Sequence, residues 1–450
     1  MSFDSLGLRA ELLSAIATQG YVTPTPIQSQ AIPVIFEGYD LLAGAQTGTG
    51  KTAAFALPIV QMLSETTTAQ KRRSPRALVL VPTRELAAQV SEQMQNYGRR
   101  LSLRSTKIYG GVNIRPQMER LARGVDIVVA TPGRLLDHAE RGTIRLHDIQ
   151  FLVLDEADRM LDLGFIEDIL RVAEYLPEKR QNLLFSATYS KSIKQLADEL
   201  LDHPRRIEVE RQNITVDAIS QTVYPVERNR KREMLSYLIR KGNWNQVLVF
   251  TRTRYGADKL TDELLFDGIK AAPIHSNKSQ SIRTRTLAEF KKGELRVLVA
   301  TDVAARGLDI ANLPYVINYE LPQVPEDYVH RIGRTGRAGE DGVAISLVCP
   351  AEHPRLVAIE KLLEYTILQE TLAGFPQIAV KRGVKTKSGQ KTGKPSKPKQ
   401  KTSKAKAVKA RKTTTKQVKQ TATKTTTTRR DKVDRNPKPG RRLSRTKPAR

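Results

Sequence analysis

Cysteine is almost absent from this sequence, since Cys349 is the single one among 450 residues. A disulfide framework is therefore excluded, and a reducing, cytoplasmic compartment fits the composition. We expect Cys349 to be a small buried residue on a strand. The first residues, Met1 to Asp4, lack the basic start and apolar run of a signal peptide. No stretch has the apolar length that would cross a bilayer, so we predict a cytoplasmic protein.

Aromatic residues are missing altogether from residues 381–450, which hold two acids, Asp431 and Asp434, against 27 lysines and arginines. This tail carries +25 of the net charge of +28, whereas the preceding residues are nearly neutral, with 48 basic and 45 acidic groups. It cannot bury enough apolar surface to offset its ordering entropy, and we predict disorder there. We interpret it as an electrostatic arm for polyanions such as RNA; the alternative is a solvated extension of little consequence.

Length and patterning predict an α/β protein with more than one domain. A chain of 450 residues with 39% hydrophobic residues is too long for one ordinary core. Short β-rich apolar runs alternate with helical patterns, which indicates parallel sheets built from βαβ units. In the first half the runs are Asp40–Gly44, Ala77–Val81, Asp126–Ala130, Phe151–Leu154 and Leu183–Ser186. In the second half they are Gln246–Phe250, Ala271–Ile274, Val297–Ala300, Tyr315–Asn318 and Ala344–Val348.

A polar stretch without clear periodicity, Arg205–Ala218, separates the two sets of runs and is interpreted as the linker region. We place one domain at 1–207, the linker at 208–217, a second domain at 218–370 and the Lys/Arg/Thr-rich tail at 371–450. No short repeat is visible, but the two halves share one plan. Ligands of open α/β sheets bind beyond the carboxyl ends of strands, where polar clusters follow most of these runs.

A glycine-rich loop between a predicted strand and a predicted helix has the character of a phosphate-binding loop. Its glycines let backbone N–H groups and the helix N-terminus face phosphates. Lys51 would reach the β- and γ-phosphates and the Thr52 hydroxyl would bind Mg²⁺. The general pattern starts with Gly, and here that place holds Ala45. The loop consists of Ala45, Gln46, Thr47, Gly48, Thr49, Gly50, Lys51 and Thr52.

Two adjacent acids follow the predicted strand Phe151–Leu154. An acid at such a strand end is where the Mg²⁺-organising carboxylate of a phosphate-loop NTPase belongs, and Asp155 suits that role. Glu156 would orient and deprotonate the attacking water. Alone, two acids at a strand end are more often a solvated turn, but beside a phosphate loop the catalytic interpretation is favoured.

The residues Asp155-Glu156-Ala157-Asp158 and the order of the other motifs over residues 1–365 resemble the DEAD-box RNA helicases. The resemblance implies two tandem RecA-like parallel-sheet domains, here followed by a disordered basic C-terminal tail. It also implies RNA-stimulated hydrolysis of ATP, with Mg²⁺, coupled to unwinding or remodelling of RNA duplexes and ribonucleoproteins. The segment Gly20–Gln28 looks like the Q motif, in which Gln28 would contact the adenine edge and Phe3 would pack on the base.

Further motifs of the first half match those that face RNA in this family. Two of the three motifs follow a predicted strand, and small or hydroxylated residues plus an arginine suit sugar–phosphate contact. Alone, each motif is weak; Thr131–Arg134, for example, also fits a turn that opens a helix. Asp158, Ser186 and Thr188 correspond to the residues that couple hydrolysis to strand separation. The implied RNA contacts in this half are Arg84, Gly110, Gly111, Thr131 and Arg134.

The second half contains the family's arginine-rich motif, His330 to Arg337. By resemblance Arg334 and Arg337 are arginine fingers that stabilise charge on the transferring γ-phosphate, and His330 bridges towards the acids. The family often has Gly after the histidine of the second strand, and here Ser276 stands in that place. The residues around Ser276 and the short N-terminal segment are most similar to those of the bacterial RhlE-type branch. The remaining implied contacts are Arg283, Thr301, Arg306 and Gly307 with RNA, and Asp309 with the ribose.

Other functions stay open at this point. A phosphoryl transferase lacks any visible acceptor-binding pattern. An RNA-binding or annealing protein driven by its tail would make the ATPase secondary. DNA is the remaining alternative substrate, because phosphate contacts do not read the 2′-OH. We expect a monomer that binds single-stranded RNA and short duplexes through a cleft between the domains and through the tail; ribosome assembly and RNA decay are equally compatible pathways.

Overall fold

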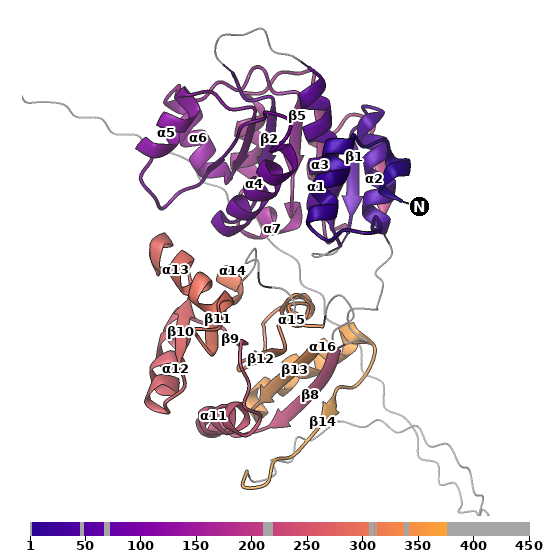
Figure 1. The fold of residues 1–450 in the computed structure, drawn as a ribbon. Coiled ribbons are helices and arrows are strands. Elements are labelled where there is room, and N and C mark those ends of the chain that lie inside the picture. Colours follow the sequence, from indigo (N-terminus) through magenta and orange to yellow (C-terminus); the bar gives the residue numbers. More distant parts are fainter. Residues whose placement is uncertain are drawn as a thin grey trace, which may run out of the picture. The chain divides into compact units, whose positions relative to one another are not determined.

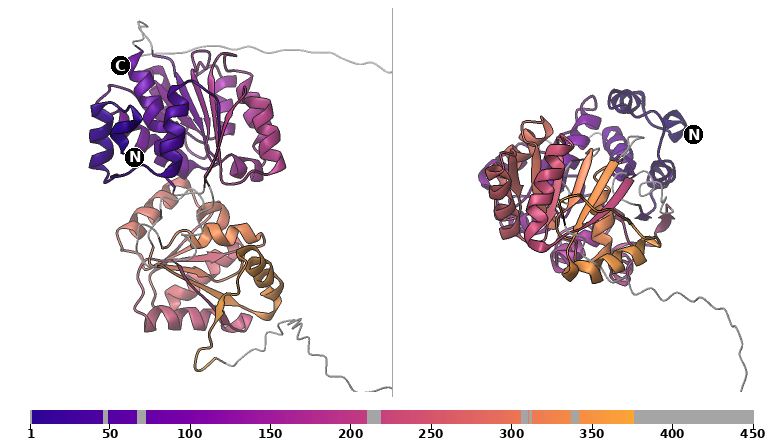
Figure 2. Two further views of the ribbon diagram at one scale, coloured as in Figure 1. Left: turned by 90° about the vertical axis from the view of Figure 1, so that its right-hand side faces the viewer. Right: turned by 90° about the horizontal axis from the view of Figure 1, so that it is seen from below.

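The computed structural model describes residues 2–45, 49–66, 73–209, 219–305, 310, 313–336 and 342–375. Within these ranges the chain forms two sheets of seven parallel strands, each flanked by helices (Figures 1 and 2). Within the same ranges, every helix is too short or too polar to cross a bilayer. Each sheet with its helices is a RecA-like unit and is considered by itself below.

The first sheet has the strand order β3-β4-β2-β5-β6-β1-β7. Its central strands are apolar on both faces, as expected for a parallel sheet covered on two sides. All neighbouring pairs are parallel, so the carboxyl ends of the strands lie at one edge of the sheet. The strands are β1 (Leu41–Gly44), β2 (Ala77–Leu80), β3 (Ser105–Ile108), β4 (Ile127–Ala130), β5 (Phe151–Leu154), β6 (Gln181–Ser186) and β7 (Arg205–Glu208).

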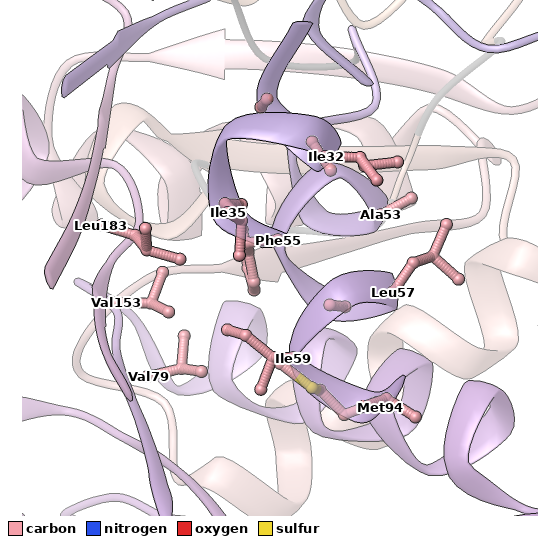
Figure 3. Close-up of a cluster of buried hydrophobic side chains, with 14 of the residues drawn as sticks. Ile32, Ile35, Ala53, Phe55, Leu57, Ile59, Val79, Met94, Val153 and Leu183 are labelled. Carbon is pink, nitrogen blue, oxygen red and sulfur yellow. The ribbon is translucent and has the colours of Figure 1, made fainter. Parts of the chain in front are cut away.

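Two apolar layers cover this sheet, and alternate strand residues point into each. Val79, Val153 and Leu183 face one layer, where Ile35 of α2 and Phe55 of α3 pack on them (Figure 3). Leu78, Leu80 and their neighbours face the other layer. The first layer is built by η1 (Phe3–Leu6), α1 (Ala10–Thr18), α2 (Pro26–Phe36), α3 (Lys51–Glu65) and α4 (Arg84–Gly98). The second is built by α6 (Pro132–Glu140), α7 (Ala157–Asp162), α8 (Ile166–Ala173) and α9 (Lys191–Leu200), while α5 (Arg115–Ala122) lies beside β3.

The second sheet repeats this plan with the order β10-β11-β9-β12-β13-β8-β14. Position by position, β9 corresponds to β2 and β8 to β1, which is the shared plan predicted for the two halves. The strands are β8 (Ile219–Pro225), β9 (Val247–Thr251), β10 (Ala271–Ile274), β11 (Val297–Thr301), β12 (Tyr315–Asn318), β13 (Gly342–Val348) and β14 (Leu368–Gln369). The helices are η2 (Arg228–Arg230), α11 (Lys231–Lys241), α12 (Arg254–Phe266), α13 (Gln280–Lys291), α14 (Asp302–Ala305), α15 (Pro325–Ile332), η3 (Pro350–Glu352) and α16 (His353–Leu363).

The ten predicted strands are all present, with ends that shift by one or two residues. One prediction is wrong: Arg205–Glu208, the first part of the stretch interpreted as linker region, forms β7 and pairs with β1. Its side chains are mostly exposed because β7 is an edge strand, which explains its polar composition. Cys349 is buried, as expected, but it lies just after β13 and not on it. Residues 210–218, which include most of the linker predicted at 208–217, and the residues beyond Phe375 lie outside the described residues.

Candidate functional site

The carboxyl ends of β1 and β5 bring Lys51 and Asp155 together. Lys51 opens α3 after Gly50, whose φ of 89° suits glycine, and Asp155 follows β5 directly. Both side chains are buried, and within the described residues neither Lys51 Nζ nor Asp155 Oδ1 has a hydrogen-bond partner. The pKa of Asp155 is raised to about 6, chiefly by burial, and the nearby Lys51 ammonium offsets part of this rise. Buried polar atoms that lack partners are costly, so this pair is built to meet a bound group.

Glu156 stands next to this pair in a conformation that non-glycine residues rarely adopt. Its φ and ψ are 54° and 50°, in the left-handed region, at the N-terminus of α7. Such a backbone costs about 1–3 kcal/mol and persists only where the surroundings impose it, commonly at functional sites. The fixed backbone sets the direction of the Glu156 carboxylate relative to Asp155.

Gln28 lies against the phosphate loop. It is buried on the first turn of α2; its Oε1 accepts a hydrogen bond from the Thr25 backbone N–H (2.9 Å), and its Nε2 donates to the Gly50 carbonyl (3.1 Å). An amide nitrogen carries two N–H groups, so one remains for a base edge. Phe3, by contrast, is a buried member of the first apolar layer. Its packing on a base stays a prediction.

Tyr189 connects the strand before the phosphate loop with the loop after β6. Its hydroxyl lies 2.8 Å from the Ile207 carbonyl of β7 and 3.3 Å from the Leu42 carbonyl of β1. Burial raises its pKa to about 12. A Cβ placed on Gly44, the last residue of β1, would lie 2.8 Å from the Tyr189 Cζ and closer still to the ring edge. Tyr189 was not predicted from the sequence, although its position directly after Thr188 could have indicated it.

We expect Gly44→Ala to lower both the melting temperature and the affinity for ATP. The added methyl group has no room beside the Tyr189 ring, and overpacking of this kind costs about 1–3 kcal/mol. Thermal melting and nucleotide titration measure the two effects. The double variant Gly44→Ala/Tyr189→Ala should be no less stable than Tyr189→Ala alone, because the obstacle is gone. If the losses of stability of the two single variants add up fully in the double variant, the proposed clash is contradicted.

The last acid of the Asp155–Asp158 motif is joined to the loop after β6. The Ala187 backbone N–H donates to the Asp158 carboxylate (3.1 Å), and the Thr188 N–H donates to the Ser186 hydroxyl (3.2 Å). The Ser186 hydroxyl in turn donates to the Thr188 carbonyl (2.8 Å). Ser186 and Thr188 therefore hydrogen-bond to each other, and Asp158 is joined to the same loop through the Ala187 backbone.

Arginines predicted to face RNA gather around the loop after β3. Both terminal nitrogens of Arg134 donate to the Val112 carbonyl at 3.2 Å. A Cβ on Gly111, whose φ is 74°, would lie 2.5 Å from the Arg84 Nη2, so this glycine makes room for the guanidinium. Gly110 lies in the same loop, and Thr131 precedes α6. Cationic groups on loops at the carboxyl edge of the sheet suit a phosphate backbone.

Two arginines of the second domain's motif, Arg331 and Arg334, have different environments. Arg331 is buried; it donates to both oxygens of Asp302 (2.6 and 2.8 Å) and to Asn318 Oδ1 (3.0 Å). It also packs 4.9 Å from the centre of the Phe250 ring. Arg334 and His330 are half-buried and line a small crevice with Asp302. Arg331 is thus a structural link between α14 and α15. This role could not be predicted from the sequence, because it depends on which residues Arg331 contacts.

The remaining predicted residues divide into two groups. Thr301 ends β11, and Arg283 lies on α13. Others fall outside the described residues: Gln46, Thr47, Gly48, Arg306, Gly307, Asp309 and Arg337.

Comparison with known proteins identifies the family. Residues 25–196 match the DEAD/DEAH box helicase domain and residues 230–339 the helicase conserved C-terminal domain. The chain is 42% identical over 388 residues to the DEAD-box ATP-dependent RNA helicase CshA of Geobacillus kaustophilus, covering 85% of this chain and 82% of that protein. It is 42% identical over 385 residues to the DEAD-box ATP-dependent RNA helicase RhpA of Helicobacter pylori, covering 86% of this chain and 76% of RhpA.

A solved structure of S. cerevisiae Dbp5 bound to RNA and ADP BeF3 matches with a TM-score of 0.74 and 34% identity, over 82% of this chain and 95% of that chain. The fold and the phosphate-loop site define a helicase of the RecA-like class. The chain belongs to the family of DEAD-box ATP-dependent RNA helicases.

Proposed function

We propose that this protein hydrolyses ATP in response to RNA and uses the cycle to unwind or remodel short RNA duplexes and ribonucleoproteins. The observation that carries the proposal is the pair of buried side chains, Lys51 and Asp155, whose terminal atoms lack partners in the described residues. An ammonium and a carboxylate at the end of a parallel sheet suit a nucleotide phosphate and its metal ion.

The site residues take the following roles in this proposal. Lys51 contacts the β- and γ-phosphates, and Glu156 orients and deprotonates the attacking water. Thr52 and Asp155 would hold Mg²⁺, which when bound neutralises charge on the phosphates. No cluster of three or more His, Cys, Asp or Glu side chains is present in the described ranges. Mg²⁺ does not require one, because it usually takes one or two carboxylates together with phosphate oxygens and water.

Coupling arises in this proposal because ATP and RNA favour the same closed arrangement of the two domains. Arg334, Arg337 and His330 of the second domain would complete the ATP site, and RNA would contact loops of both domains. Two ligands that stabilise one state reinforce each other, which makes hydrolysis RNA-dependent. The contact between Asp158 and Ala187 supports a link from the phosphate site to the loop after β6.

The finer assignments rest on the sequence. We propose domain limits at 1–207, 208–217, 218–370 and 371–450, with the first limit moved to Glu208 because β7 ends there. We also propose a cytoplasmic monomer and a tail that binds RNA electrostatically. The similarity of residues 275–283 favours the RhlE-type branch, whereas the relatives named above are CshA and RhpA. Ribosome-assembly or RNA-decay complexes are the partners that such an activity would serve.

The proposal is tested by ATPase rates with ATP or GTP, each with single-stranded RNA or DNA added. We expect hydrolysis of ATP but not GTP, and stimulation by RNA. Gln28→Ala should reduce the preference for ATP over GTP at least tenfold, because a site that pairs with polar atoms of a base rejects bases that leave them unpaired. Gln30→Ala, an exposed glutamine on the same helix, is the matched control. Equal hydrolysis of GTP by the unmodified protein would contradict the role of Gln28.

A further inference from the structure

A groove of about 770 Å³ lies on the second domain, away from the residues assigned to ATP or RNA. We call it the α11 groove, because α11 forms one wall and Asp267, directly after α12, lies on the other. All of its lining comes from residues 229–267. The side chains that matter are Arg232, Ser236, Tyr237, Arg240, Lys241 and Asp267.

The acids of the α11 groove are already neutralised by neighbours. Asp267 accepts two hydrogen bonds from Arg232 (3.1 and 2.5 Å) and one from Ser236 (2.6 Å). Glu233 accepts two from Arg230 (2.9 and 2.8 Å). These arginines hold the pKa of both carboxyls below the usual range. Arg240 donates to the Asp267 carbonyl, a neutral group, so the positive charges of Arg240 and Lys241 are in excess and the groove attracts anions.

Two exposed aromatic rings lie beside cations of the groove, Tyr237 in its lining and Phe266 next to Arg232. Tyr237 is 40% exposed and Phe266 is 86% exposed. The Lys241 ammonium lies 5.5 Å from the centre of the Tyr237 ring, and the Arg232 guanidinium lies 5.6 Å from that of Phe266. A single exposed ring needs no explanation, but two rings beside one basic groove match the stacking platforms of proteins that bind single-stranded nucleic acid.

The described part of the second domain ends beside this groove. Phe375, the last described residue, packs edge-on against Tyr237 with ring centres 6.3 Å apart. The Arg230 guanidinium lies 4.4 Å from the centre of the Phe375 ring and holds it in place. The sequence after this point carries the 27 lysines and arginines of residues 381–450.

We propose that the α11 groove is a second binding site for single-stranded RNA, in which bases stack on Tyr237 and Phe266 while Arg240 and Lys241 contact phosphates. This inference rests on the proposed activity on RNA. Stacking and phosphate contact together favour RNA over a protein segment, because an acidic peptide would use the cations and leave the rings without a matching partner. An RNA long enough to reach the groove from the helicase motifs binds more tightly than a short one.

The test uses the full chain and two single-stranded RNAs, one of about 10 and one of about 40 nucleotides, lengths chosen from typical site sizes. The variant Tyr237→Ala/Lys241→Glu should raise the concentration of long RNA that gives half-maximal ATPase stimulation about tenfold, the size of one lost stack and one lost phosphate contact. The maximal rate, and all values with short RNA, should not change. Tyr237→Phe/Lys241→Arg should behave like the unmodified protein.

The control is Tyr175→Ala/Lys179→Glu, which changes an exposed tyrosine and lysine with the same spacing on the first domain. It should not change the half-maximal concentration of either RNA. Unchanged binding of long RNA by the groove variant would overturn the proposal and point to a protein partner. An equal rise in the half-maximal concentrations of the long and the short RNA would also overturn it. Direct binding of the long RNA, measured by fluorescence anisotropy, keeps the groove testable should ATPase stimulation itself be absent, a result that would contradict the proposed function instead.

Discussion

Replacing Glu156 with glutamine is expected to abolish ATP turnover while ATP and RNA still bind. The substitution keeps the size and the hydrogen-bonding reach of the side chain but removes its ability to take a proton from water. General bases contribute about 10²- to 10⁴-fold to such reactions, so the RNA-stimulated rate should fall by at least a hundredfold. The backbone of Glu156 is already fixed in the left-handed region, and an amide does not change that preference. Steady-state phosphate release measures the rate, and equilibrium titration measures binding.

Glu167→Gln is the matched control, because Glu167 is an exposed glutamate on α8 in the same domain. It should retain turnover within about twofold, since surface substitutions of this kind are nearly neutral. If Glu156→Gln keeps its turnover, the base is another group, and Asp155 is the nearest candidate. If Glu156→Gln also loses ATP affinity, Glu156 acts in binding and its proposed role is wrong.

The parallel sheets were predictable because buried strands in them are short continuous apolar runs. The strands that escaped prediction lie at or near sheet edges. β3 contains Lys107, β7 is mostly exposed, and β14 has two residues. β8 pairs with β13 along its whole length. On its other edge it pairs with β14 only at Leu368 and Gln369, so β8 lies close to the edge of the sheet. Edge strands bury one face or less, and their composition then resembles that of a loop.

The residues of the site also fall into two groups: some are predicted by a local sequence motif, and others are recognised only from the tertiary structure. Lys51, Asp155 and Glu156 were predictable because the phosphate loop and the strand-end acids are contiguous in sequence. Tyr189 and Arg331 were not, because their roles depend on partners far along the chain. Tyr189 bonds to the Leu42 and Ile207 carbonyls, and Arg331 binds Asp302. Arg331 and Arg334 belong to one motif, and burial separates them: Arg331 is buried, whereas Arg334 is half-buried.

That separation leads to opposite expectations for Arg334 and Arg331. Arg334→Ala should lower RNA-stimulated ATPase activity about 10³-fold with little change in melting temperature, since arginine fingers contribute 10³ to 10⁵ and Arg334 is half-buried beside a crevice. Arg337→Ala should do the same, as its predicted role is equivalent. Arg331→Ala should instead destabilise the second domain by about 3–5 kcal/mol, because it leaves Asp302 without its buried cation.

Activity at saturating RNA and thermal melting, measured on the three variants side by side, test this division. Arg355→Ala, a partly exposed arginine of α16, is the control and should change neither quantity by much, because its guanidinium lies as far as 4.0 Å from Glu352, whose buried partner is Lys231. Retained ATPase activity in Arg334→Ala and Arg337→Ala would refute a site completed by the second domain. A normal melting temperature for Arg331→Ala would show that its link between α14 and α15 adds no stability, and an accompanying loss of activity would then place Arg331 among the residues that act on ATP.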